Sequence, residues 1–105
     1  MRNKVIDVLI EMGRPTNIKG FDFIVEAMEL FEDKDIRTGK TTWLYHLIAK
    51  KHDSTESRVE RAIRYAFGIV ITQGDLEVVN KYLTMNRTTN SNLLRTFYLR
   101  LTQEE

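Results

Sequence analysis

The sequence predicts an all-α domain of about six helices built around a central helix-turn-helix. Apolar residues recur at steps of three and four along most of its 105 residues, and the alternation typical of a half-buried strand is absent. A hydrophobic content of 42% and a charged content of 30% are typical of a soluble globular domain with one core. The single proline leaves no Pro-rich linker, so residues 1–105 are interpreted as one domain.

Two helices are expected in the N-terminal third of the chain. The first, over residues 2–12, has one apolar face, and Gly13 followed by Pro15 would end it. The second, over about residues 21–31, is apolar on more than one side and is expected to be the most buried helix. The strip that remains carries three acids, which we expect to be solvated. These are Asp22, Glu26 and Glu29.

Residues 33–40 are polar and are expected to form a loop before the third helix. Thr41 or Thr42 then caps this helix, which runs to about His52. Trp43 flanks its apolar face and is interpreted as an anchor in the core or at its edge rather than as a base-stacking surface. The apolar face itself consists of Leu44, Leu47 and Ile48.

A polar break separates the third helix from the next one. The segment Asp53-Ser54-Thr55 is of the kind that ends one helix and begins another. Ser54 or Thr55 can cap the new helix, whereas Ser57 with Glu60 fits a capping box that would begin it slightly later. Both starting points stay open at this stage.

The break also has the spacing of a helix-turn-helix, which requires a small residue, a turn residue and a β-branched residue at fixed offsets. Ala49, Asp53 and Val59 occupy these three positions. Glycine is usual at the turn, but aspartate adopts the left-handed conformation more readily than most residues. The spacing therefore favours a helix-turn-helix centred on the break.

The helix after the break, expected over about residues 55–72 and ended by Gly74, has two unlike faces. A helix-turn-helix places such a recognition helix in the major groove of DNA. An ordinary amphipathic helix with a solvated charged face has the same pattern, and spacing alone does not separate the two. The apolar face contains Val59, Ala62, Ile63, Ala66, Phe67 and Val70, and the polar face contains Arg58, Glu60, Arg61, Arg64 and Tyr65.

The C-terminal third predicts two further helices. Asp75 can cap a short fifth helix, residues 84–92 are polar, and a last helix begins near Asn90 or Ser91. An apolar seam along the last helix could complete the core or form a dimer contact, and the limited apolar surface of so short a chain favours the core. The seam consists of Leu93, Leu94, Phe97, Tyr98 and Leu101.

Charge is segregated along the chain although the net charge is only +1. Residues 21–35 contain six acids and one lysine, residues 36–52 contain four basic residues and no acid, and residues 84–102 contain three arginines and no acid. Attraction to phosphate depends on such local fields more than on the total charge. Basic surfaces are therefore expected beside the recognition helix.

No pattern predicts catalysis, a cofactor, a metal site or a membrane segment. Without cysteine, disulfides, thiolate metal sites and cysteine nucleophiles are excluded. His46 and His52 are six positions apart, so they do not share a helix face as metal ligands four apart would. The Gly-Lys-Thr at residues 39–41 lacks the glycine that a phosphate-binding loop needs five positions earlier, where Lys34 stands. No apolar run approaches the ~20 residues that span a bilayer.

Four segments carry a family resemblance in order along nearly the whole chain. They are EMGRPTNIKG (11–20), IKGFDFIVEAMEL (18–30), LIAKKHDSTESRVERAIRYAF (47–67) and TNSNLL (89–94). Together they resemble the C-terminal DNA-binding domain of the stage zero sporulation protein A family, the sporulation response regulator of endospore-forming bacteria. The most specific piece is SRVERAIR at residues 57–64.

The resemblance implies a six-helix regulator of transcription that binds a box resembling TGTCGAA, often as head-to-tail pairs. The positions that face the bases in the family are Glu60, Arg61 and Arg64 here. Arginine can bind the O6 and N7 atoms of guanine, and glutamate can accept from N4 of cytosine, each discriminating by ~1–3 kcal/mol. Contacts to the DNA backbone are expected from Lys40, Lys50, Lys51, Thr55, Ser57 and Arg58.

The resemblance also implies partners and a location. They are double-stranded DNA, a homodimer on tandem sites and the promoter-recognition subunit of RNA polymerase, in a bacterial cytoplasm at the nucleoid. The family's phosphorylated receiver domain is not expected, since 105 residues have no room for it. The alternative function is a helical protein-interaction module that kept the fold and modulates a DNA-binding relative.

Overall fold

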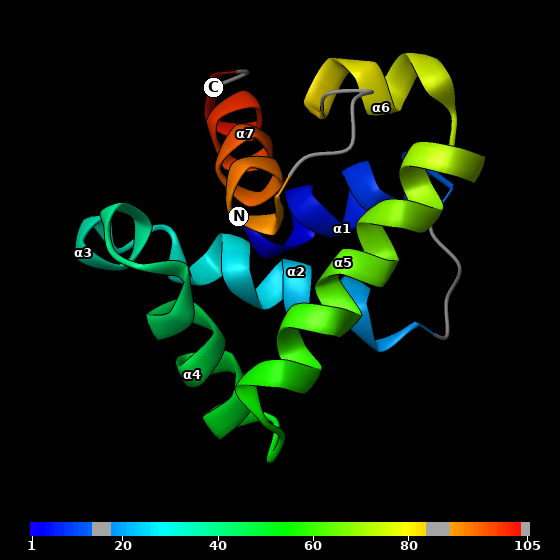
Figure 1. Cartoon of the computed structure of the whole chain (residues 1–105). Coiled ribbons are helices and arrows are strands. Elements are labelled where there is room, and N and C mark those ends of the chain that lie inside the picture. Colours follow the sequence, from blue (N-terminus) through cyan, green and yellow to red (C-terminus); the bar gives the residue numbers. More distant parts are fainter. Residues whose placement is uncertain (14–17, 84–88, 104–105) are drawn as a thin grey trace.

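The computed structural model describes residues 1–13, 18–83 and 89–103, and in them it contains seven α-helices and no strand (Figure 1). The predicted all-α class is confirmed. The expected helix stop at Pro15 and the loop over residues 84–88 lie outside the described residues. The helices are α1 (Arg2–Glu11), α2 (Lys19–Leu30), α3 (Lys34–Thr38), α4 (Thr41–Lys51), α5 (Glu56–Gln73), α6 (Leu76–Tyr82) and α7 (Asn90–Gln103).

Helix α2 is the central element, as its many-sided apolar pattern predicts. It contacts α1, α4, α5 and α7, and Phe21, Ile24 and Met28 are completely buried. Its closest approach is to α5 at Gly20, where a Cβ atom would overlap the carbonyl oxygen of Ala62. Helix α5 therefore rests directly on the most buried helix of the domain.

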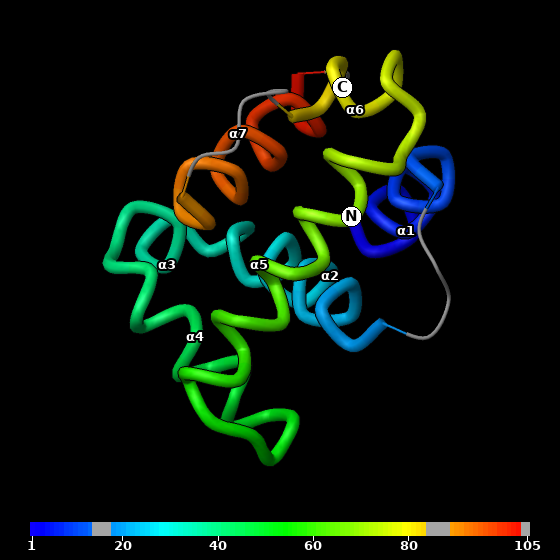
Figure 2. The backbone as a smooth tube through the Cα atoms, turned by 45° about the vertical axis from the view of Figure 1, so that its right-hand side comes forward, coloured from blue at the N-terminus to red at the C-terminus, as the bar shows by residue number. Residues whose placement is uncertain are grey.

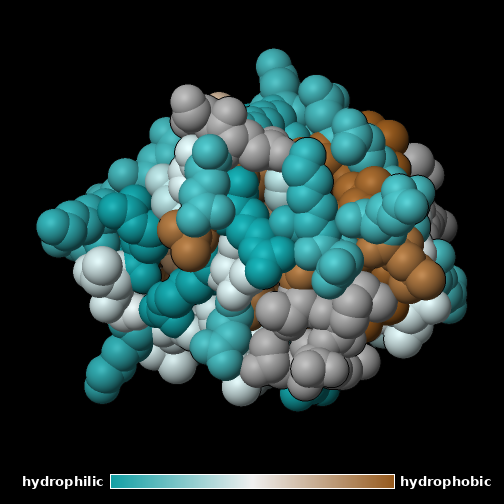
Figure 3. All heavy atoms as spheres, turned by 90° about the horizontal axis from the view of Figure 1, so that it is seen from above, coloured by the Kyte–Doolittle hydropathy of each residue, from teal (hydrophilic) through white to brown (hydrophobic). Residues whose placement is uncertain are grey.

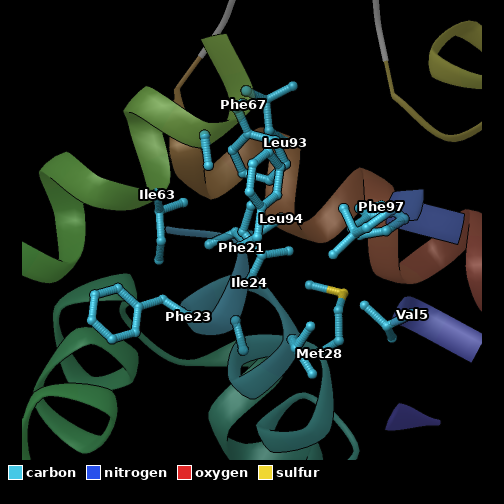
Figure 4. Close-up of a cluster of buried hydrophobic side chains, with 14 of the residues drawn as sticks. Val5, Phe21, Phe23, Ile24, Met28, Ile63, Phe67, Leu93, Leu94 and Phe97 are labelled. Atoms are coloured by element: carbon cyan, nitrogen blue, oxygen red, sulfur yellow. The ribbon is translucent and has the colours of Figure 1, made fainter. Parts of the chain in front are cut away.

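The core is one cluster to which α1, α2, α4, α5, α6 and α7 contribute. In Figure 4, Phe21 and Ile24 of α2 lie against Phe67 of α5 and Leu94 of α7. Leu93, Phe97 and Leu101 of α7 are also buried, so the apolar seam of the last helix completes the core. Exposed apolar side chains remain elsewhere, and in Figure 3 hydrophobic atoms gather mainly on one side of a largely hydrophilic face.

Helix α3 corrects the expectation of a loop over residues 33–40 and raises the number of helices from about six to seven. Its N-cap is Asp33, whose carboxylate accepts from the backbone N–H of Asp35 at 2.9 Å. Arg37 in its last turn donates to the carbonyl of Phe31 at 2.7 Å and lies over the ring of Tyr98. A five-residue polar helix has no apolar periodicity to reveal it.

Glu26 corrects the expectation that the acids of α2 form a solvated strip. Its side chain is only 7% exposed. Its carboxylate accepts from Nζ of Lys51 at 3.0 Å, and Nε2 of His52 and a guanidinium nitrogen of Arg2 lie at 3.6 and 3.5 Å. Asp22, in contrast, is exposed. The buried acid is compensated by three basic side chains from α1 and from the end of α4.

The start of α4 differs from the expected threonine cap. The N-cap is Lys40, which makes no side-chain cap hydrogen bond, and the hydroxyl of Thr41 donates to Oγ of Ser91 on α7 at 3.0 Å. Trp43 is 51% exposed and lies outside the buried core. Leu44, Tyr45 and Ile48 form the buried face of the helix instead.

Candidate nucleic-acid interface

The turn between α4 and α5 has helix-turn-helix geometry. Asp53 adopts a positive φ of 50°, and the N–H of Ser54 donates to the carbonyl of Ala49 at 2.8 Å. Thr55 is the N-cap of α5, and its hydroxyl accepts from the N–H of Arg58 at 3.2 Å. Of the two starting points for this helix, the Thr55 cap is therefore the one adopted. The buried small and β-branched positions are confirmed as well, at Ala49 and Val59.

Helix α5 separates its two faces as predicted. The buried side rests on α2, α4 and α7, and its first turns extend with α4 away from the rest of the molecule (Figure 2). Arg58, Arg61, Arg64 and Tyr65 are exposed, and Glu60 is partly exposed. The buried residues of the helix are Val59, Ile63, Ala66, Phe67, Gly68, Val70 and Ile71.

The polar face of α5 contains an ion pair and a side-chain hydrogen bond between residues one helical turn apart. A carboxylate oxygen of Glu60 lies 3.2 Å from a guanidinium nitrogen of Arg64, one turn along the helix. Nε of Arg61 donates to the carbonyl of Ser57 at 3.3 Å. These side chains, with two from α4, line an open hollow of about 590 Å³. Its lining is Thr42, Tyr45, Glu56, Ser57, Glu60, Arg61 and Arg64.

Two buried residues that the sequence did not predict as site residues lie next to the polar face of α5. Asn90, buried at the start of α7, donates from Nδ2 to the carbonyl of Glu60 at 2.9 Å. Tyr45 of α4 is also buried, and burial raises the pKa of its phenol while a hydrogen bond with Asn90 acts in the opposite direction. The sequence contained one signal for Asn90. It lies in the TNSNLL segment, one helical turn before the apolar seam that starts at Leu93.

Residues 5–101 match the family model described as the C-terminal domain of the sporulation initiation factor Spo0A. The chain belongs to this family. The Spo0A C-terminal domain is a DNA-binding effector domain of a transcription regulator and not an enzyme family, so this chain is a DNA-binding regulatory domain.

The six residues of this Spo0A-type domain that are predicted to contact the DNA backbone lie in two places. Thr55, Ser57 and Arg58 lie together at the start of α5, beside Arg61. The three lysines lie at the two ends of α4, with Lys40 at its N-cap and Lys50 and Lys51 in its last turn. All six are exposed, but the ammonium of Lys51 is bonded to the buried carboxylate of Glu26.

Two further features of this Spo0A-type domain concern ions and membranes. Among residues 1–13, 18–83 and 89–103, no group of three or more His, Asp or Glu side chains could hold a metal ion. None of the helices in these ranges is long and apolar enough to cross a bilayer.

Proposed function

We propose that the chain is a sequence-specific regulator that inserts α5 into the major groove of a TGTCGAA-like box. The observation that carries this proposal is the split of α5 into a face buried on α2 and a face with Glu60, Arg61 and Arg64 next to the helix-turn-helix turn. An α-helix fits the major groove, and the N-terminal part of a recognition helix contacts the base edges.

Charge and hydrogen-bonding capacity support direct reading of a CG step. Arg61 and Arg64 each offer a fork of N–H donors for guanine, and Glu60 offers acceptors for the amino group of cytosine. Glu60 and Arg64 form a 3.2 Å ion pair on the exposed face. An exposed pair of this kind contributes little free energy, so both side chains stay available to bases.

Contacts to phosphate and sugar give the affinity that does not depend on sequence. We assign them to the N-terminal turn of α5, to the last turn of α4 before the turn, and to Lys40 at the opposite end of α4. Lys51 must share its ammonium between Glu26 and DNA, so we expect its contribution to be the smallest. The proposed residues are Lys40, Lys50, Lys51, Thr55, Ser57 and Arg58.

The proposal extends to organisation and partners. We propose that residues 1–105 act as one DNA-binding unit, pair as homodimers on tandem boxes and contact the promoter-recognition subunit of RNA polymerase in the bacterial cytoplasm, at the nucleoid. Membership of the Spo0A family supports these roles. The fold supports a single unit, because one hydrophobic cluster contains residues from Val5 to Leu101.

The test is a titration of labelled duplexes at ~150 mM salt, a concentration at which nonspecific binding is weak. One duplex contains the TGTCGAA-type box and the other a scrambled sequence. We expect the unchanged chain to prefer the box and Arg61→Ala to lose about 1–3 kcal/mol of that preference. Arg58→Ala is the matched control, since loss of a phosphate contact weakens binding to both duplexes alike.

Equal, weak binding of both duplexes by the unchanged chain would refute sequence-specific recognition. That result would favour the alternative function, a protein-interaction module that modulates a DNA-binding relative. If Arg61→Ala kept the full preference, base readout would have to come from other residues of α5.

A further inference from the structure

Trp43 is the only tryptophan in the sequence, and it is exposed on the outer side of α4. Its indole stacks on the imidazole of His46 one turn along, with 5.7 Å between ring centroids and 20° between ring planes. An exposed indole whose ring plane is fixed by a neighbour is a common contact surface for a partner, because it adds large area at little entropic cost. Neither residue belongs to the apolar face that holds α4 in the core.

The stacked pair lines a second open hollow of about 540 Å³, which adjoins the hollow of the recognition helix. Thr42 and Glu56 take part in both. The two hollows are therefore neighbours on the surface, and a strand of DNA that lies along the first turns of α5 could continue into the second hollow. The lining of this hollow is Gly39, Lys40, Thr42, Trp43, His46 and Glu56.

An exposed ammonium in a basic segment of the chain lines one side of this hollow. Lys40 is exposed at the N-cap of α4, and residues 36–52 contain no acid. The carboxylate that does line the hollow, Glu56, lies 3.7 Å from Nδ1 of His46. A sugar-phosphate strand combines an apolar sugar edge for an indole with a phosphate for an ammonium.

We propose that this hollow binds the sugar-phosphate backbone next to the box, with the Trp43 indole on a deoxyribose and the Lys40 ammonium on a phosphate. The inference rests on the proposed function, because the first helix of a helix-turn-helix crosses the DNA backbone when the second lies in the groove. In this proposal, Trp43 and His46 extend the contact of the protein to the duplex that flanks the box. The occupant is duplex DNA. The site responds to how far the duplex extends beyond the box and not to its base sequence.

The test uses the single tryptophan as its own reporter. The full chain is titrated with a duplex trimmed to the box and with one extended by about half a helical turn at each end. Fluorescence anisotropy of the labelled DNA measures binding, while Trp43 emission and its quenching by acrylamide measure contact. We expect both duplexes to bind, and only the extended one to change the emission and protect Trp43 from acrylamide.

Variants separate contact from folding. We expect Trp43→Ala to weaken binding of the extended duplex by about fivefold, the order of one aromatic contact, and to leave the trimmed duplex unaffected. Trp43→Phe should retain most of the affinity, and Leu76→Ala, an exposed apolar residue on α6, should change neither duplex. Arg61→Ala should weaken both.

Three results would overturn the inference. One is binding of the extended duplex with unchanged Trp43 emission and acrylamide quenching. Another is equal binding of both duplexes by Trp43→Ala and the unchanged chain, which would leave the hollow to a protein partner. Absence of any anisotropy change with either duplex would reject the proposed function itself, and the inference with it.

Discussion

Glu26 is a single buried acid that joins three helices. Burial alone raises the pKa of its carboxyl, but the hydrogen bond and charge of Lys51, with the charges of His52 and Arg2, outweigh burial and lower it. A carboxyl with a lowered folded-state pKa adds stability above its ordinary value of 4.5 and loses that stability as the pH falls through the folded-state value.

We predict that Glu26→Gln lowers the free energy of unfolding by about 1–2 kcal/mol at neutral pH, because it removes the charge that the Lys51 ammonium pairs with. The difference from the unchanged chain should shrink as the pH falls below 4.5, where the acid itself becomes protonated. Urea unfolding at several pH values measures this. Asp22→Asn, an exposed acid on the same helix, should have little effect, and a pH-independent difference for Glu26→Gln would contradict the ion-pair role.

Individual residues were predictable where a helical period determined their environment. The period placed Val5, Ile63 and Phe97 in the core, and all three are completely buried. Glu26 could not be assigned in the same way, because its partners come from segments far apart in the sequence. The same reason hid Asn90, whose hydrogen bond to the carbonyl of Glu60 joins residues 30 positions apart.

The contact between α2 and α5 positions the helix that we propose for DNA recognition. Because the missing side chain at Gly20 lets the two backbones approach, we predict that Gly20→Ala lowers the free energy of unfolding by about 2–4 kcal/mol. The added methyl would meet backbone atoms of Ala62, which cannot rotate away. Thermal unfolding followed by far-UV circular dichroism measures the loss.

Lys19→Ala is the control for that experiment. It replaces an exposed neighbour of Gly20 on the same helix with alanine, which has a higher helix propensity. It should alter the stability by no more than about 0.5 kcal/mol. If Gly20→Ala were equally mild, the two helices would have to separate without cost, and the close approach would not be important for stability.

At the scale of helices, the sequence predicted those whose apolar period is long or whose cap is local. The positive φ at Gly13 agrees with the helix end expected there, and the Asp75 carboxylate accepts hydrogen bonds from the backbone N–H groups of Glu77 and Val78 at the expected start of α6. Helix α3 was missed because a polar helix of five residues has no apolar period. The contact of its Arg37 with the ring of Tyr98 also joins residues far apart in the sequence.

For the molecule as a whole, Arg95 joins the last helix to the segment that precedes the helix-turn-helix. Its guanidinium donates to the carbonyls of Arg37 at 3.2 Å and Gly39 at 2.7 Å, and also to Oγ of Ser91. We predict that Arg95→Met lowers the free energy of unfolding by about 2–3 kcal/mol, because these backbone acceptors lose their partner. Chemical denaturation measures the effect.

Arg100 offers a matched comparison on the same helix, since its guanidinium donates to the carbonyls of Asn80 at 2.8 Å and Lys81 at 3.1 Å. Those carbonyls lie at an exposed site, where water can replace the lost donor, so Arg100→Met should cost less than about 1 kcal/mol. Equal costs for the two variants would mean that Arg95 contributes no more than a surface hydrogen bond.

The sequence indicated the fold class and the helix-turn-helix because both depend on local periodicity and on one capped turn. It indicated Glu60, Arg61 and Arg64 only through the SRVERAIR motif, and their contacts with bases stay a prediction. It could not indicate the second hollow, which Trp43 lines, because that surface forms only when residues of α4 and the start of α5 lie together.

The hydrogen bond from Nζ of Lys4 on α1 to the carbonyl of Leu101 on α7, 2.6 Å long, brings the first and last helices together. Helices α1 and α7 both lie away from the turn between α4 and α5 (Figures 1 and 2). A label or tether attached to an exposed residue of α7 would therefore leave the α4–α5 turn facing outward.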